Sequence, residues 1–443
     1  MRFTAKELTA IILPLIIEQF LAVTIGMADS VMVASAGEAA ISGVSLVDTI
    51  NLLLVYVFSA LSSGGAIIIS QLMGKDDIYN AQRAAKQLIW VVFAVAFGLS
   101  VTALVFRRSL LSLVFGSLEQ DVMKNAMIYF LFTAMSYPFL GIYNACAAVF
   151  RSMGNTKTSM YSSFIMNFIN IGGNAILILG FNMGAAGAAI STLVSRMIGC
   201  VFMLYLLHNK NNILYIEKLF DYRPDFGTIR KICALGIPTG IESGMFQFGK
   251  VLTQSVISTM GTAQIAANAV AGNLATFQYT PGIAVGLSMV TIVGQCIGAG
   301  DKKQAKKYAI LLVGIAYSML FVVSALLCIF VNPIISFYGL GAESASVAKD
   351  LIFTHSILAC IMHPFAFAIV NSFRAANDVK FPLVISTFSM WVFRVGFSYI
   401  LGIYFKLGVM GVWIAMYCDW LFRVIIYVPR YISGTWLTKY KAS

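Results

Sequence analysis

Long apolar runs alternate with short polar connections along almost the whole chain. Each run reaches the length of about 20 residues that an α-helix needs to cross a bilayer, and none has the period-two alternation of a membrane β-strand. Because only helices and closed barrels satisfy every backbone polar group inside lipid, the pattern predicts an all-α polytopic membrane protein. The twelve expected transmembrane helices span residues 8–34, 45–73, 86–106, 126–150, 159–182, 185–207, 230–258, 269–298, 307–331, 350–373, 382–405 and 408–430.

Composition and charge agree with this class. Of the 443 residues, 59% are hydrophobic and 11% charged, whereas a soluble chain carries about 25% charged residues. The net charge of +12 alone would also fit a nucleic-acid-binding protein, but Lys and Arg gather at both ends of the chain and in every second connection. The positive-inside rule therefore predicts that both termini are cytoplasmic, where these cations face anionic membrane lipids; no nucleic acid partner is expected. The other connections hold only Arg107, Arg108, Lys124, Lys349 and Lys406.

The chain repeats itself after about 224 residues. An even number of spans in each half gives both halves the same orientation, which predicts a parallel repeat of two six-helix bundles around a central cleft, as alternating access requires. The paired motifs are LPLIIE (13–18) with IPTGIE (237–242), FRSMGNTK (150–157) with FRAANDVK (373–380), and MGAAG (183–187) with LGVMG (407–411).

The repeat sets the expected domain limits. Residues 1–207 form the N-terminal bundle, residues 232–443 form the C-terminal bundle, and residues 208–231 form a cytoplasmic linker between them. The linker is either a plain connection or contains a short helix on the membrane surface.

Taken together, these motifs resemble the multidrug and toxic compound extrusion (MATE) family over nearly the whole chain. The resemblance rests on the paired Pro-x-x-x-Glu starts, the paired FRSMGNTK and FRAANDVK loops, and the segments SQLMGKDDIYNAQRAAK, GQCIGAGDKKQAKKY, GNAILILGFNMGAAGAAISTLVSR and WIAMYCDWLFRVIIYVPRYISGTW. It implies a twelve-helix bacterial inner-membrane antiporter that exports organic cations or other amphipathic drugs in exchange for H⁺ or Na⁺. We expect a monomer without a cofactor.

Asp29 stands alone among apolar neighbours in VTIGMADSVMVAS (23–35). Ionisable residues inside a membrane are costly and mark functional sites by default, and the repeat does not require this one because Thr253 is its counterpart. Asn167, Asn170 and Asn174 follow an i, i+3, i+7 pattern, which puts three amides on one helical face. A carboxylate with neutral oxygen donors suits H⁺ or Na⁺; the alternative is ordinary interhelical hydrogen bonding, worth about 0.6–2 kcal/mol for each bond.

The resemblance sharpens this hypothesis. It implies an N-terminal ion site with an Asn and an Asp four residues apart on one helix and a Thr on the next. Asn170 and Thr192 match this pattern, whereas Asn174 stands where the family has the Asp. We therefore expect Asp29, Asn170, Asn174 and Thr192 to bind H⁺ or Na⁺, with Asp29 as the sole carboxylate.

Several further polar residues are candidates for the substrate cleft. Glu18 and Glu242 each follow a Pro by four residues, which fits either an architectural role or a pair of acids in the cleft. Lys250 and Arg394 lie mid-span and should pair with an acid or, for Lys250, titrate. The resemblance also implies a second site with acids on spans seven and ten, but span ten has none after Asp350. The complete set is Glu18, Asn167, Glu242, Lys250, Asn268, Asn273, Gln278, Tyr279 and Arg394.

One ion pair and one side-chain direction follow from the positions of charged residues within the expected spans. Asp419 and Arg423 are four residues apart and predict an ion pair within one helix. Arg196, near the end of the sixth expected span, is expected to extend toward the interface.

No catalytic motif is present, and the absence of a GxxxxGK[ST] loop argues against ATP as the energy source. We therefore expect a transporter rather than an enzyme. The main alternative is a flippase for a lipid-linked saccharide or lipid precursor, in which Lys250 and Arg394 would hold a pyrophosphate. A non-transporting receptor or channel is disfavoured by the repeat and by Asp29.

Overall fold

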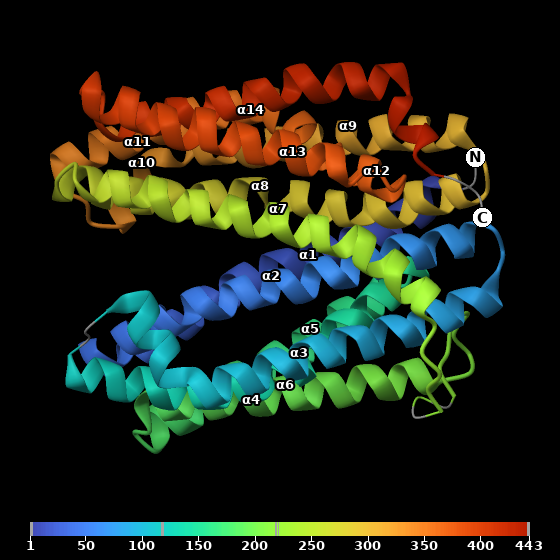
Figure 1. Ribbon diagram of the computed structural model, residues 1–443. Helices are drawn as coiled ribbons and strands as arrows, with labels where there is room; N and C mark the ends of the chain where they lie inside the picture. Colours follow the sequence, from blue (N-terminus) through green and yellow to red (C-terminus); the bar gives the residue numbers. More distant parts are fainter. Residues whose placement is uncertain (1–2, 117–118, 218, 220, 441–443) are drawn as a thin grey trace. The chain divides into compact units, whose positions relative to one another are not determined.

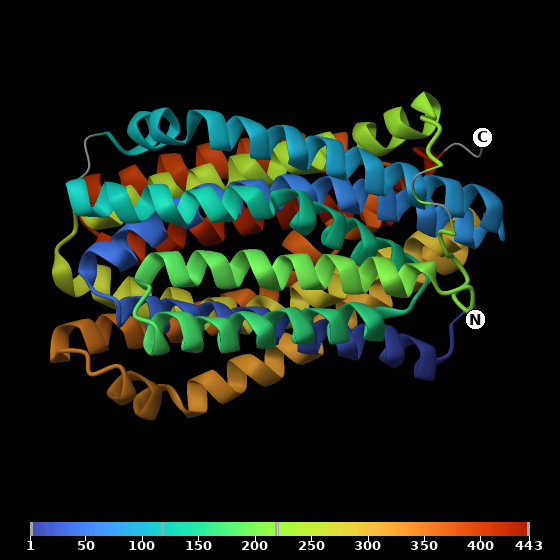
Figure 2. The same ribbon diagram turned by 90° about the horizontal axis from the view of Figure 1, so that it is seen from below.

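The computed structural model describes residues 3–116, 119–217, 219 and 221–440, and these residues contain helices and turns but no strand (Figures 1 and 2). The helices are α1 (Ala5–Ala34), α2 (Glu38–Gly74), α3 (Ile78–Phe115), α4 (Gln120–Ser152), α5 (Thr156–Asn174), η1 (Ala175–Gly180), α6 (Gly184–His208), α7 (Phe226–Ser258), α8 (Thr262–Gly298), α9 (Lys302–Ile329), α10 (Val331–Phe337), α11 (Ala342–His363), η2 (Pro364–Ala368), α12 (Val370–Ala375), α13 (Lys380–Ser389), η3 (Met390–Gly396), η4 (Ser398–Tyr404), α14 (Gly408–Ser433) and η5 (Thr435–Thr438).

Every expected span coincides with one of these helices or with a run of consecutive ones. Within the described residues, 11 helices are long and apolar enough to cross a membrane. The helix that falls short is α7, because Glu242, Gln247, Lys250 and Gln254 make its sequence more polar. The prediction of an all-α polytopic membrane protein is confirmed.

The chain divides into two compact units, one of residues 5–240 and one of residues 241–440 with the first described residues. In the N-terminal unit, α4 packs against α2, α3 and α6, while α1 packs against α5 (blue to green in Figure 1). In the C-terminal unit, α8 packs against α9, α11 and α12, while α14 packs against η3 and η4 (yellow to red). The division falls inside α7, between Gly240 and Ile241.

The repeat is visible in the backbone as well as in the sequence. Positive φ angles recur 224 residues apart at Gly37 (102°) and Gly261 (90°), and at Asn182 (54°) and Lys406 (56°). The π-helices η1 and η4 end the fifth and the eleventh expected spans at equivalent positions. The two halves therefore use the same turns, which the pairing of MGAAG with LGVMG predicts.

A glycine in each of these motifs lets two helices approach closely. A Cβ atom on Gly411 would lie 2.7 Å from the backbone of Leu401, and one on Gly187 would lie 3.1 Å from the carbonyl carbon of Leu177. Small residues at such crossings let helix backbones meet in a membrane protein. The close crossing thus explains why both motifs end in a glycine.

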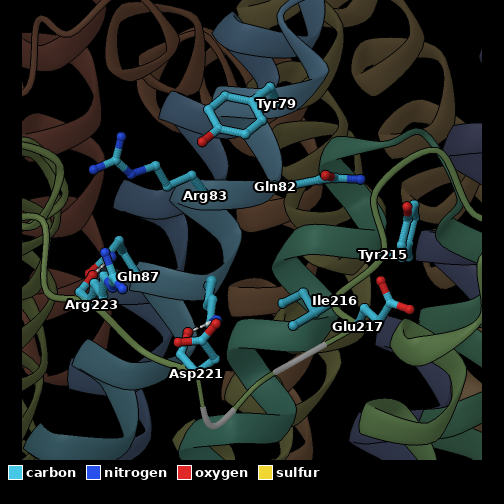
Figure 3. Close-up of a pocket in the computed structure, with 10 residues that line it drawn as sticks. Tyr79, Gln82, Arg83, Gln87, Tyr215, Ile216, Glu217, Asp221 and Arg223 are labelled. Atoms are coloured by element: carbon cyan, nitrogen blue, oxygen red, sulfur yellow. Dashed lines mark hydrogen bonds between the residues drawn. The ribbon is translucent and has the colours of Figure 1, made fainter.

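Of the expected linker of residues 208–231, the described residues of 209–225 form turns and no helix, while His208 ends α6 and residues 226–231 begin α7. Residues 218 and 220 lie outside the described part. The linker is held against α3, where the Gln87 amide donates to the backbone oxygen of Arg223 (2.7 Å) and the Trp90 indole donates to that of Leu219 (3.0 Å). A hollow of about 360 Å³ lies between α3 and the linker, and the residues that line it are drawn in Figure 3. These contacts fasten the linker to the N-terminal unit.

Candidate functional site

Three helices of the N-terminal unit bring the four predicted ion-site residues together. The Asn174 side chain on α5 donates to Asp29 Oδ1 on α1 at 2.8 Å. Both ends of the Asn170 side-chain amide find hydrogen-bond partners when its nitrogen faces Asp29. The nitrogen then lies 2.9 Å from Asp29 Oδ2 and 3.0 Å from Oδ1. The other end of that amide then lies 3.3 Å from Thr192 Oγ1 on α6. One carboxylate is therefore held by two amides.

The third asparagine of the α5 face is separate from this group. The side chain of Asn167 donates to Ser163 Oγ on its own helix at 3.2 Å. Ser191, on α6, donates to the backbone oxygen of Asn170 at 2.7 Å and so ties the middle of α5 to its neighbour.

A second carboxylate lies close to Asp29, so Asp29 is not the sole acid of the predicted ion site. Asp48 on α2 accepts hydrogen bonds from Asn51 and from the Tyr129 hydroxyl of α4, both at 3.0 Å. It is close enough to Asp29 for the two carboxylates to interact electrostatically. We missed Asp48 because the expected span began at residue 45, which put it at the membrane interface. In the structure, α2 begins at Glu38, and Asp48 lies almost three turns inside the helix.

Arg196 supplies the positive charge of this region. Its guanidinium donates to Ser136 Oγ at 2.7 Å and interacts electrostatically with both Asp29 and Asp48. The prediction that Arg196 extends toward the interface is therefore wrong; the side chain points into the bundle, where two carboxylates attract it. The group consists of two acids, one cation and two amides.

The two Pro-x-x-x-Glu motifs form equivalent ion pairs in the two units. Glu18 Oε1 lies 3.8 Å from Arg151, and Glu242 Oε2 lies 2.7 Å from Arg374. Each Glu also accepts a hydrogen bond from a serine, Glu18 from Ser159 at 3.0 Å and Glu242 from a serine of α13 at 2.7 Å. Both Glu side chains are buried. This twofold arrangement favours the architectural interpretation of the two acids.

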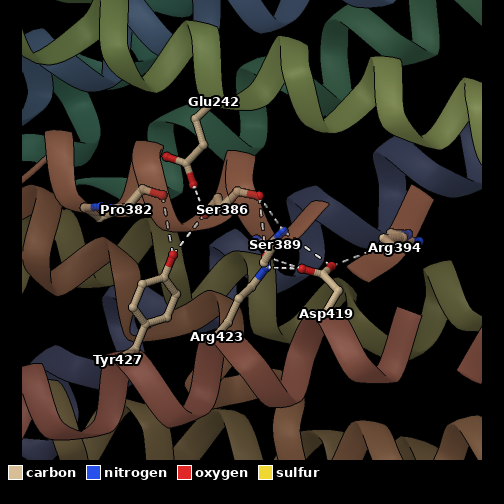
Figure 4. Close-up of polar contacts among 8 residues, drawn as sticks. All are labelled: Glu242, Pro382, Ser386, Ser389, Arg394, Asp419, Arg423 and Tyr427. Atoms are coloured by element: carbon tan, nitrogen blue, oxygen red, sulfur yellow. Dashed lines mark hydrogen bonds and ion pairs between the residues drawn. The ribbon is translucent and has the colours of Figure 1, made fainter. Parts of the chain in front are cut away.

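The C-terminal unit has its own charged group, around Asp419 (Figure 4). Asp419 pairs with Arg423 at 2.7 Å, as the spacing within α14 predicted, and Ser389 hydrogen-bonds to both. Arg394 approaches Asp419 from the opposite side at 3.9 Å. Phe246 of α7 lies against both guanidinium groups, 5.3 Å from that of Arg394 and 5.6 Å from that of Arg423.

The remaining cleft candidates lie in different surroundings. Among the described residues, Lys250 has no carboxylate within ion-pair distance, so the expected pairing with an acid is not found. Asn268 accepts from the Trp413 indole (2.8 Å) and donates to Gln254 (3.2 Å), and Asn273 is exposed.

Two more of the predicted cleft residues, Gln278 and Tyr279, make contacts within the C-terminal unit. Gln278 is buried and its amide bonds Ser324 of α9. Tyr279 stacks on His363 with ring centroids 5.5 Å apart. Gln278 is therefore enclosed in the C-terminal unit, whereas Tyr279 is partly exposed.

A duplicated helical membrane fold with ionisable groups inside both units defines a class of secondary transporters. The family model of MatE matches residues 14–176 and 238–400, two segments that are again 224 residues apart. The chain belongs to the MatE family of transporters, and it is not an enzyme.

Individual relatives agree. The chain is 27% identical over 437 residues to the uncharacterized transporter YisQ of Bacillus subtilis, covering 96% of this chain and 94% of that one. It is 25% identical to the probable multidrug resistance protein NorM of Thermotoga maritima, covering 97% and 93%. An outward-facing multidrug resistance MATE family transporter has the same fold, with a TM-score of 0.91, 19% identity and coverage of 98% and 96%.

Proposed function

We propose that this protein is a secondary active multidrug efflux antiporter of a bacterial inner membrane. It exports organic cations or amphipathic drugs in exchange for H⁺ or Na⁺ by alternating access, as a monomer with both termini in the cytoplasm. Residues 1–207 and 232–443 act as the two bundles and residues 208–231 as their linker. The observation that carries the proposal is the Asp29 carboxylate held by the two amides of α5.

The contacts of Asp29 support a site that binds and releases a small cation. Both amides donate to the carboxylate, which is the pattern that an ionised acid requires. Binding of H⁺ or Na⁺ neutralises the charge and requires at least one amide to rotate, so that its oxygen faces the cation. Occupied and empty states thus differ in the contacts between α1 and α5, and a ligand shifts a conformational equilibrium through such differences.

Exchange then follows if the coupling ion and a cationic substrate compete for the same negative charge. Asp48 adds to that charge and Arg196 limits it. Two acids against one guanidinium leave one uncompensated negative charge in this group of residues when both acids are ionised. This suits one monovalent cation at a time.

The test is Asp29→Asn in reconstituted vesicles, with dye efflux driven by a pH gradient and, separately, by a Na⁺ gradient. The neighbouring Ser30→Ala is the control, since Ser30 bonds only the backbone of its own helix. We expect the Asn variant to lose gradient-driven efflux by at least about tenfold, as the loss of an essential charge implies, and Ser30→Ala to retain it. Unchanged efflux by Asp29→Asn would falsify the proposal. The gradient, pH or Na⁺, that drives dye efflux by Ser30→Ala identifies the coupling ion.

The flippase alternative retains one favourable observation: Lys250, which pairs with no carboxylate among the described residues, lies one turn from Phe246, the ring that contacts Arg394. Translocation of a lipid-linked saccharide in vesicles that show no efflux of dye would support it instead.

A further inference from the structure

The interior of the C-terminal unit has an excess of positive charge. Each of its three acids that are buried within the described residues is engaged by an arginine of its own, Glu242 by Arg374, Asp419 by Arg423 and Asp378 by Arg430. Arg394 reaches only the far side of Asp419, at 3.9 Å. Arg394, inside the unit, and Lys250, at its surface, are therefore two cations in excess of the buried carboxylates. Charge left uncompensated in such a place is costly, so an anion would be stabilised there.

Lys250 and Arg394 are the two cations left for such an anion. Both lie beside Phe246, because its ring is 5.3 Å from the Arg394 guanidinium and Lys250 follows it by one turn on the same face of α7. Lys250 is not a product of the repeat, because its counterpart 224 positions earlier is Gly26. Within the described residues, no carboxylate is placed between the two. A bound oxyanion would bridge them and remove their mutual repulsion.

Lys250 lies on a polar stripe of α7 that is open on the surface of this unit. Gln247 is partly exposed, and Lys250, Gln254 and Ser258 are exposed. Their spacing of three and four residues puts them on one helical face. A Lys among other polar groups on a membrane helix indicates a water-accessible surface rather than one that faces lipid. A solute can therefore reach the ammonium group from water.

Next to the cations lie an aromatic platform and a spare hydrogen-bond donor. Phe246, one turn before Lys250, stacks against the Arg394 guanidinium at 5.3 Å. The buried Tyr417 hydroxyl of α14 has no hydrogen-bond partner among the described residues, and Tyr417 interacts electrostatically with Arg394. A buried donor without an acceptor costs about 1–3 kcal/mol. An oxyanion near Arg394 would supply an acceptor.

We infer that the C-terminal unit holds an anion site in which Lys250 and Arg394 bind a carboxylate or similar oxyanion of an amphipathic solute, with Phe246 contacting its apolar body. Asp419 positions Arg394 without neutralising it, because Arg423 holds Asp419 more closely. The site deepens the proposed transport function: it adds zwitterionic and anionic amphiphiles to the substrates. A role of this anion site in export rests on the proposed antiport function, whereas binding of an anion at the site does not.

The test measures equilibrium binding to the purified full-length protein without any ion gradient. The probes are a zwitterionic rhodamine with a free carboxylate and its methyl ester, which differ only in that anionic group. We expect the wild type to prefer the free acid by about tenfold, the scale of one charge-assisted contact. Lys250→Met and Arg394→Gln should remove the preference, and Lys250→Arg should keep most of it. Lys349→Met, a cation that lies over Phe353 of α11, is the matched control and should change nothing.

Two results would overturn the inference. The first is an unchanged preference for the free acid in Lys250→Met, with ester binding intact as proof of folding. The second is a lipid occupant: if phosphatidylglycerol in nanodiscs displaces the free acid and itself binds less tightly to Lys250→Met, the site belongs to a lipid headgroup. Asp29→Asn separates this proposal from the previous one, since it should abolish antiport and leave the preference for the free acid unchanged.

Discussion

The Asn174 amide donates to the Asp29 carboxylate at 2.8 Å across the contact between α5 and α1. The position of Asn174 is the one at which the resemblance implies a second acid. A second carboxylate, Asp48, nevertheless lies near Asp29 on a different helix. The number of acids is thus the same as in that pattern, while their separation and the donors between them differ.

Asn174→Asp is expected to tighten binding of the coupling ion. The new carboxylate would face Asp29 at hydrogen-bond distance, and two such acids need a shared proton or cation. We expect the half-saturating concentration of the coupling ion to fall by at least about fivefold, measured as the ion dependence of efflux from vesicles. Asn167→Asp, one amide further along the same face, is the control and should have a smaller effect. Equal effects of the two variants would contradict the assigned contact.

Arg196 and Asp48 should act on that ion in opposite directions. Removing the cation in Arg196→Gln leaves both carboxylates exposed to the ion, whereas Asp48→Asn removes one negative charge. We expect the apparent affinity for the coupling ion to rise about two- to tenfold in the first variant and to fall in the second. Efflux assays over a series of ion concentrations measure both. A shift in the same direction in both variants would show that the electrostatic interpretation is wrong.

The two repeated ion pairs should differ in strength. Glu242→Gln breaks a buried pair of 2.7 Å, for which about 3–5 kcal/mol of destabilisation is typical, while Glu18→Gln affects a pair of 3.8 Å and should cost less. Thermal unfolding in detergent, followed by tryptophan fluorescence, should therefore show the lower midpoint for Glu242→Gln. The double variant Glu242→Met/Arg374→Met should recover part of the loss, because no buried charge is then left alone.

Gly411→Ala should destabilise the C-terminal unit. Its new methyl group would meet the Leu401 backbone at 2.7 Å, and backbone shifts of this kind cost about 1–3 kcal/mol. Gly98→Ala is the matched control: it also lies in a long helix, but nothing lies within 4 Å of the added carbon. We expect a lower unfolding midpoint only for Gly411→Ala, and an equal decrease in both variants would count against the close crossing.

Asp77 offers a test at the edge of the membrane. It caps α3, accepting from the backbone (3.2 Å) and side-chain (2.7 Å) nitrogens of Asn80, and these bonds lower its pKa below the ordinary 3.8. The carboxylate thus stabilises the fold fully above the ordinary pKa, and this contribution is lost as pH falls through the lowered one. Asp77→Ala should cost about 1 kcal/mol at neutral pH, and the difference from wild type should shrink in acid. Asp77→Asn, an uncharged cap, should follow wild type at neutral pH; a difference for Asp77→Ala that grows in acid would contradict the cap.

Helical periodicity made the Asp29 group predictable. The three amides of α5 share a face because of local spacing alone, and one acid in an apolar run points to a partner nearby. Asp48 was missed because its helix extends further toward its start than hydropathy indicates. The ion pair of Glu242 with Arg374 was also missed, although the motifs of both residues were recognised in the repeat. Contacts between distant helices depend on packing, which a single sequence does not specify.

The polar face of α7 also bears on how the protein is synthesised. A Lys inside a membrane helix costs up to about 2.5–3.5 kcal/mol during insertion by the translocon. In addition, α7 lacks the apolar sequence that marks the other eleven spans found within the described residues. A nascent chain that ends at Ser258 should therefore fail to integrate this segment stably. Integration of α7 should await α8, whose long apolar sequence follows after a short turn, so the seventh and eighth segments enter the bilayer as a hairpin.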